Sequence, residues 1–136
     1  MKLTDETARG LEAGAVLRLL AWIAMHGESE TLIRHVHARG LEDAAGPVPN
    51  VPEDWSAAGP ALEWLNKQHC GEASVAYFGY QNEPEQWHAS YLEVPDQGYE
   101  IVDAPTPTLA IARAVVLVGL RERPDEMQAA WEVLNV

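Results

Sequence analysis

The chain has 136 residues, 47% of them hydrophobic, and carries 21 acidic against 9 basic side chains for a net charge of −12. That length predicts one domain over residues 1–136, and the apolar content excludes a disordered chain. The negative charge excludes direct binding of DNA or RNA, because such binding needs a positive surface. Two interpretations of the charge stay open: solubility alone, or attraction to a basic partner.

The sequence predicts a cytoplasmic protein without a membrane segment. Cys70 is the only cysteine, so no disulfide forms within the chain, which favours an intracellular setting. The N-terminus lacks the basic-then-apolar pattern of a signal peptide. The longest apolar runs fall short of the ~20 residues that cross a bilayer.

The N-terminal third is predicted to be a helical hairpin over residues 1–45. Thr4 caps a first helix that continues to His26, with apolar residues at three- and four-residue steps. A second helix, from Glu30 to Arg39, follows after a short link, which favours antiparallel packing of the two helices. The segment from Leu41 to Asp54 is predicted to be an irregular loop, because a glycine and three prolines interrupt it.

The remainder, residues 50–136, is predicted to follow the order helix, three strands, two helices. A helix starts at Asp54 or Ser56 and ends near Gln68. The strands cover residues 73–80, 86–94 and 99–102, and their short turns make the sheet an antiparallel meander. A final helix opens at Arg123-Pro124-Asp125, with Pro124 in its first turn.

The stretch from Thr106 to Leu120 organises the fold. Thr106 is a good N-cap and Pro107 suits the first helical position. Apolar residues then occupy nearly every face, and Arg113 is the single charge among them. Such a helix must be covered on several sides. We therefore expect an α+β fold, in which helices cover both faces of a three-stranded antiparallel meander and an N-terminal helical hairpin is added.

One segment carries a family resemblance. The run Thr106-Pro107-Thr108-Leu109-Ala110-Ile111-Ala112-Arg113-Ala114, together with the helix that begins near Glu53-Asp54-Trp55-Ser56 and the strands between them, resembles the phage ABA sandwich domain. The resemblance covers about residues 50–122 and implies a helix–sheet–helix fold and a phage origin. It implies no activity and no catalytic residues.

No residue pattern indicates catalysis, a metal or a cofactor. His35 and His37 lie two apart on a helix and point about 200° from each other, so they cannot share one metal ion. His69 and Cys70 are adjacent, which rarely gives the geometry of a nucleophile and its base. The carboxylates around the two hairpin turns are equally well explained as a solvated sheet edge: Glu83, Glu85, Glu93, Asp96 and Glu100. We expect a protein that is not an enzyme.

Aromatic and acidic residues alternate near the strand ends, which is typical of a protein-binding face with a negative rim. The alternative, that Trp55 and Trp87 belong to the core, is equally compatible with the sequence. The candidate partner-binding residues are Trp55, Tyr80, Glu83, Glu85, Trp87, His88 and Asp96.

Two functional hypotheses follow. In the first, the chain is a phage-derived protein that inhibits a host defence protein, such as a CRISPR effector, by occluding its basic surface. In the second, an oligomer sequesters a nucleotide-like signal, with tryptophan stacked on the base and the phosphate bound by Arg113, Arg121 and Arg123.

Overall fold

The computed structural model describes residues 2–68, 73–79, 81–93 and 98–134. Within them lie seven helices and one three-stranded antiparallel sheet, which confirms the α+β class. The N-terminal helices are α1 (Asp5–Arg9), α2 (Ala15–His26), α3 (Ser29–Arg39) and α4 (Leu41–Ala45). They are followed by α5 (Trp55–Gln68), β1 (Ser74–Phe78), β2 (Gln86–Glu93), β3 (Gly98–Ala104), α6 (Pro107–Glu122) and α7 (Pro124–Leu134).

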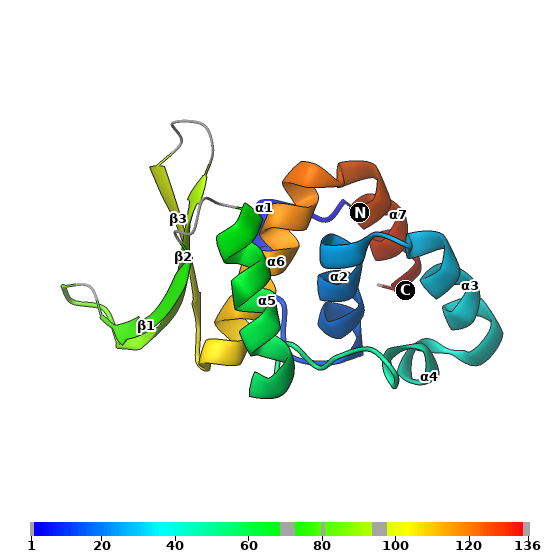
Figure 1. Ribbon diagram of the computed structural model, residues 1–136, viewed down its shortest axis with the longest axis horizontal. Helices are drawn as coiled ribbons and strands as arrows, with labels where there is room; N and C mark the ends of the chain where they lie inside the picture. Colours follow the sequence, from blue (N-terminus) through cyan, green and yellow to red (C-terminus); the bar gives the residue numbers. More distant parts are fainter. Residues whose placement is uncertain (1, 69–72, 80, 94–97, 135–136) are drawn as a thin grey trace.

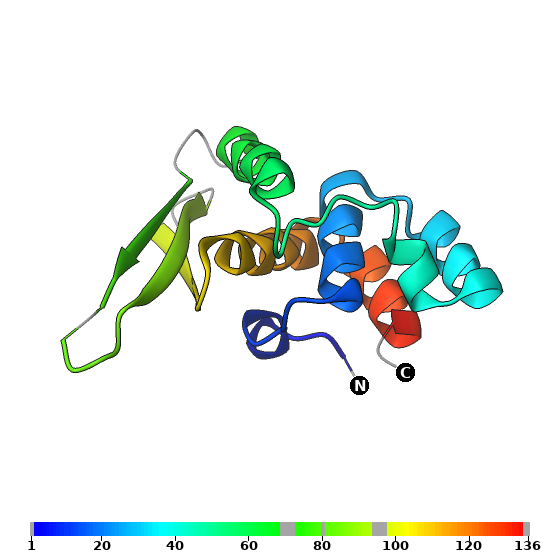
Figure 2. The same cartoon turned by 90° about the horizontal axis from the view of Figure 1, so that it is seen from below.

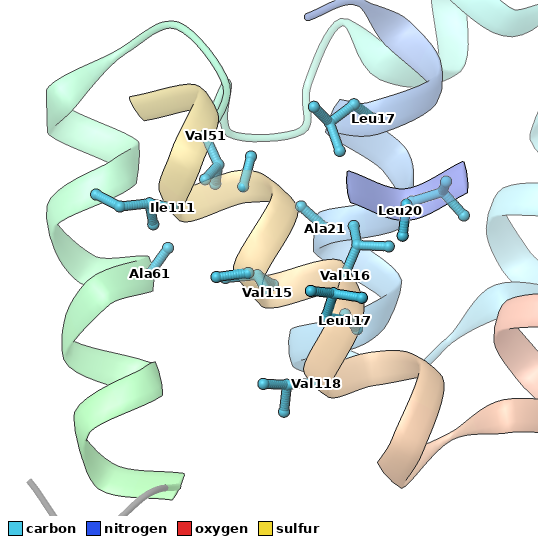
Figure 3. Close-up of a cluster of buried hydrophobic side chains, with 14 of the residues drawn as sticks. Leu17, Leu20, Ala21, Val51, Ala61, Ile111, Val115, Val116, Leu117 and Val118 are labelled. Atoms are coloured by element: carbon cyan, nitrogen blue, oxygen red, sulfur yellow. The ribbon is translucent and has the colours of Figure 1, made fainter. Parts of the chain in front are cut away.

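Helix α6 is the centre of the molecule, as its sequence predicts. Thr106 Oγ1 accepts a hydrogen bond from the Leu109 amide at 3.2 Å, and every residue from Thr108 to Gly119 is buried. The helix runs between α5 and α2, where Ile111 lies near Ala61 and Val116 lies near Ala21 (Figure 3). The apolar helix is therefore covered by its neighbours on all sides.

The two ends of the molecule are built differently. The sheet forms one end, α5, α6 and α1 lie against one of its faces, and the remaining helices form the opposite end (Figures 1 and 2). Of the described helices, only α6 makes extensive contact with the strands. Our expectation of helices on both faces of the sheet therefore does not hold in this respect, and one face stays open.

The N-terminal region differs from the expected hairpin in three ways. The first helix is split, because Gly10 ends α1 and the Leu11 carbonyl accepts from the Arg113 side chain instead of a helical amide. Helix α3 packs on α4 and α7 rather than on α2. A short helix, α4, occupies residues that we expected to be loop, because the prolines all follow it.

The segment between α4 and α5 is held by side chains from two helices. Arg18 of α2 donates to the carbonyl oxygens of Val48 and Gly46 at 2.6 and 3.0 Å. Thr108 of α6 donates to the Pro52 carbonyl at 2.7 Å. Asp54 then caps α5 by accepting from the Ser56 amide at 2.9 Å, and hydrogen bonds from Ser56 lower the pKa of the Asp54 carboxyl. These contacts fix the path of an otherwise irregular segment.

Candidate binding surface

The strand register assigns every second residue of the sheet to the face that α6 does not cover. We call this surface the open face. In β2, Ala89 and Tyr91 are buried against the helices, whereas their neighbours point the other way. The described side chains of the open face are Ser74, Ala76, Phe78, Gln86, His88, Ser90, Tyr99, Ile101 and Asp103. Tyr99 is 57% exposed, so the surface presents aromatic area to solvent.

His88 lies at the centre of the open face and organises its neighbours. It is only 4% exposed, because the Phe78 ring stacks on the imidazole with centroids 4.1 Å apart. Its Nε2 lies 3.0 Å from the Phe78 carbonyl oxygen, and its Nδ1 lies 3.4 Å from Asp103 Oδ1. The imidazole thus connects all three strands and fixes the Phe78 ring against the sheet.

The charged side chains of the sheet segment are all acidic, and one of them, Glu100, is paired with arginines of α1 and α6. Residues 73–106 contain six of the chain's 21 acids and no lysine or arginine, which leaves fifteen acids and all nine bases to the rest of the chain. Glu83 and Glu85, in the turn after β1, are exposed, and Asp103 is exposed on the open face. A negative field with aromatic groups at its centre favours a cationic partner.

The predicted partner-binding residues do not form one surface. Trp87 points toward the helices, with its ring centroid 5.3 Å from that of Tyr77, whereas His88 points to the open face. Trp55 begins α5 and is 52% exposed. Glu83 and Glu85 lie in the β1–β2 turn, and Tyr80 and Asp96 fall outside the described residues.

Two aromatic residues of the open face were missing from that prediction, namely Phe78 and Tyr99. Alternation in β2 separates Trp87 from His88 and could have shown which neighbours share the surface of His88. The two-residue alternation of side chains shows which residues of one strand share a face. Only the pairing register shows which residues of the neighbouring strands lie on that same face.

Each of the three arginines proposed for phosphate binding already has an oxygen partner. Arg113 is buried, and its Nε and Nη1 donate to the Leu11 and Asp103 carbonyls at 2.8 and 2.9 Å. Burial lowers the pKa of its guanidinium, against the opposing effect of Glu12 and Asp103. Arg123 lies 3.8 Å from the Glu126 carboxylate in an ion pair.

Arg121 belongs to a separate cluster at the junction of sheet and helices. It donates to the Tyr91 hydroxyl at 3.1 Å and pairs with Asp5 and Glu100 at 3.1 and 2.8 Å. Arg9 pairs with the other oxygen of Glu100 at 3.0 Å. Burial raises the pKa of the Tyr91 hydroxyl, although the hydrogen bond from Arg121 opposes this shift. The cluster ties α1, β2, β3 and α6 together.

The other candidates give no catalytic arrangement. His35 pairs with Asp43 at 2.8 Å, across α3 and α4, and His37 is exposed. His69 and Cys70 fall outside the described residues. Over residues 2–68, 73–79, 81–93 and 98–134, no three histidine, cysteine or carboxylate side chains are grouped closely enough to hold a metal ion.

A small apolar cavity lies between α2, the proline-rich segment and α5. It measures about 230 Å³ and is lined by Trp22, Met25, His26, Pro49, Val51, Ser56, Ala57 and Pro60. The rings of Trp22 and His26 lie 4.0 Å apart in its wall. Its volume is below that of a typical drug-sized ligand pocket, and no arginine lines it.

No helix in the described part of the chain combines the length and apolarity that crossing a membrane requires. Comparison with protein-family models, with curated proteins and with solved structures finds no match to this chain.

Proposed function

We propose that this chain is a non-enzymatic binding protein that docks its open sheet face on a basic surface of another protein and thereby inhibits it. The observation that carries the proposal is the coincidence of two properties in one element. The sheet segment holds six acids and no base, and its outer face exposes aromatic side chains. Interface centres are enriched in aromatic residues, and complementary charge guides the approach of the partner.

Occlusion is the simplest mechanism for such a surface. A basic groove that holds nucleic acid is attracted to the same negative field, and an acidic sheet in that groove excludes the nucleic acid. The resemblance to phage proteins, which stays a prediction, directs the search for the partner toward host defence proteins such as CRISPR effectors. The nucleotide-sequestering hypothesis has less support, because each of the three arginines is already bound by carbonyl or carboxylate oxygens or a hydroxyl.

The test compares charge reversals at the two ends of the molecule. One variant carries Glu83→Lys and Glu85→Lys in the β1–β2 turn, together with Asp96→Lys, which lies outside the described residues. The control carries Glu30→Lys, Glu42→Lys and Glu132→Lys on exposed positions of α3, α4 and α7. Both variants change the net charge by the same amount, so a difference between them reports the location of the charge and not its total.

Wild-type protein captures a partner from a cell lysate, and the affinity of that purified partner is then measured for each variant. The sheet variant should bind roughly 30-fold more weakly or worse, and the control should stay near wild type. A nucleic acid that the partner binds should compete with the wild-type protein. Equal affinity of the two variants, or a partner that binds nucleic acid and this chain at once, contradicts occlusion by the sheet.

A further inference from the structure

The two edges of the sheet are treated differently by the rest of the chain. At β3, Arg9 Nη1 donates to the Ile101 carbonyl at 2.7 Å and Arg113 Nη1 donates to the Asp103 carbonyl at 2.9 Å. These two residues are two apart along the strand, so their carbonyls point to the same side. Guanidinium groups therefore occupy the acceptors that another strand would use at this edge.

Alternation in an antiparallel ladder then fixes which residues of β1 face outward. The backbone carbonyls of Ile101 and Asp103 point away from β2. The backbone groups of the alternate residues of β3 therefore bond to β2, through the pairs of Ala89 with Val102 and of Trp87 with Ala104.

The even-numbered residues of β2 must then direct their amides and carbonyls toward β1. The pairs that they form are Ser74 with Ser90, Ala76 with His88, and Phe78 with Gln86. The amides and carbonyls of Val75 and Tyr77 consequently point to the free edge of β1.

This edge has no protection in the described part of the chain. The outward amide of Ala73 is bound by Asn66 Oδ1 at 2.8 Å, but no side chain of the described residues binds the amides or carbonyls of Val75 and Tyr77. Tyr77 is 54% exposed. β1 contains no charged residue and no proline, although these are the usual means of protecting an edge from pairing.

We propose that the free edge of β1 receives an extended, basic segment of the partner as a fourth strand. This inference rests on the proposed function and specifies how the partner binds. Main-chain hydrogen bonds to Val75 and Tyr77 supply affinity, as in other complexes formed by strand addition. Charge selects the occupant: a second copy brings another chain of net charge −12 and its own acidic sheet, whereas a segment rich in lysine or arginine meets an opposite field.

The added strand alternates its side chains between the two faces of the sheet. One set lies beside Tyr77, whose ring packs on Trp87, and suits apolar residues. The other set lies beside Ala76 and Phe78 on the open face, where the acidic charge of the sheet segment favours basic residues. A segment with alternating basic and β-branched residues fits both faces.

The experiment uses three peptides and amide hydrogen exchange followed by NMR on the full chain. The probe is Lys-Val-Lys-Val-Lys-Val-Lys. A second peptide replaces every lysine by glutamate. A third, Lys-Val-Lys-Pro-Lys-Val-Lys, keeps the charge but cannot extend a ladder, because proline lacks an amide hydrogen. At saturation in low salt, the lysine–valine peptide should slow exchange of the Val75 and Tyr77 amides by roughly ten-fold or more.

Two variants separate the backbone from the side chain. Val75→Pro removes an outward amide without removing a bond to β2, and it should abolish the binding of the lysine–valine peptide. Val75→Thr keeps the amide and should bind like wild type. Thermal unfolding of both variants checks that the sheet is intact.

The outcomes distinguish the inference from the function on which it rests. Slowed exchange with the first peptide alone, lost in Val75→Pro, supports strand addition. Equal binding of the proline-containing peptide, or no slowing at Val75 and Tyr77 with millimolar peptide, overturns strand addition and leaves charge recognition by the open face standing. Equal binding of the glutamate peptide contradicts charge recognition itself and therefore the proposed function.

Discussion

The helical end and the sheet end of this protein differ in how far their apolar side chains are buried. In the helical end, α6 is buried along its length and α2 packs directly on it. In the sheet, helices cover one face only, and three of the four exposed large hydrophobic side chains of the described residues lie there: Tyr77, Phe78 and Tyr99. Charge also differs between the two ends, because all nine bases lie outside the sheet segment, residues 73–106.

The difference teaches where stability and recognition are placed. Burial of apolar surface stabilises a fold in proportion to area, so the helical end and its contact with the covered face of the sheet contribute most of it. An open face with exposed aromatic groups contributes little stability and is available for a partner. The comparison predicts that substitutions at the two ends separate stability from binding.

The largest effect is expected at the crossing of α2 and α6. A Cβ at Gly119 would lie 2.5 Å from Ala24 Cβ and 3.0 Å from its Cα, so the helices must move apart to accept a side chain. Gly119→Val should lower the free energy of unfolding by about 3 kcal/mol, measured by denaturant titration. Gly59→Ala is the matched control, since nothing lies within 4 Å of its Cβ position in α5; it should stabilise by about 0.5 kcal/mol. Similar changes in the free energy of unfolding for Gly119→Val and Gly59→Ala would contradict the tight packing of α2 on α6.

The second effect concerns the connection between the two ends. Arg113→Met leaves the Leu11 and Asp103 carbonyls without their charged donor, and it should lower the free energy of unfolding by about 2 kcal/mol. Arg123→Met removes an exposed ion pair and should cost less than about 1 kcal/mol. Chemical denaturation of both variants provides the measurement. A larger loss from Arg123 would show that the buried arginine does not join the sheet to the helices.

The third effect is a dependence on pH at the same junction. The pKa of Tyr91 is raised in the folded protein, so unfolded Tyr91 ionises first as the pH rises. Its contribution to stability is complete below pH ~10 and is lost as the pH rises through the folded pKa. Melting temperatures between pH 8 and 11 should therefore fall more steeply for wild type than for Tyr91→Phe. Parallel curves would indicate that the hydroxyl ionises equally in both states.

The smallest effect on stability is expected at the sheet turn. Glu83→Gln with Glu85→Gln removes two exposed charges and should change the free energy of unfolding by less than about 0.5 kcal/mol. The same pair should weaken partner binding measurably, because it reduces the negative field. Loss of stability without loss of binding at these positions would reverse the roles assigned to the two ends.

Much of the fold could be predicted because its signals are local. The cap at Thr106, the proline at position 107 and the apolar run after them, with Arg113 as its single charge, place α6 without knowledge of its neighbours. The split between α1 and α2 could not be predicted in the same way. It depends on Leu11 binding Arg113, a contact between residues 102 positions apart.

The candidate surface was only partly predictable for a related reason. His88 and the two glutamates were recognisable from composition, but Phe78 and Tyr99 join His88 only through the strand register. Likewise, Arg113 and Arg121 look like free cations in the sequence, whereas their carbonyl and carboxylate partners come from α1 and β3. Long-range pairing, and not local propensity, decides both cases.

The most direct test of the central claim is hydrogen–deuterium exchange of the complex with the captured partner, compared with the free chain. The account predicts protection in β1, β2 and the turn that contains Glu83 and Glu85, with unchanged exchange in α3, α4 and α7. Protection confined to α3, α4 and α7, with the strands unchanged, would contradict the assignment of recognition to the sheet.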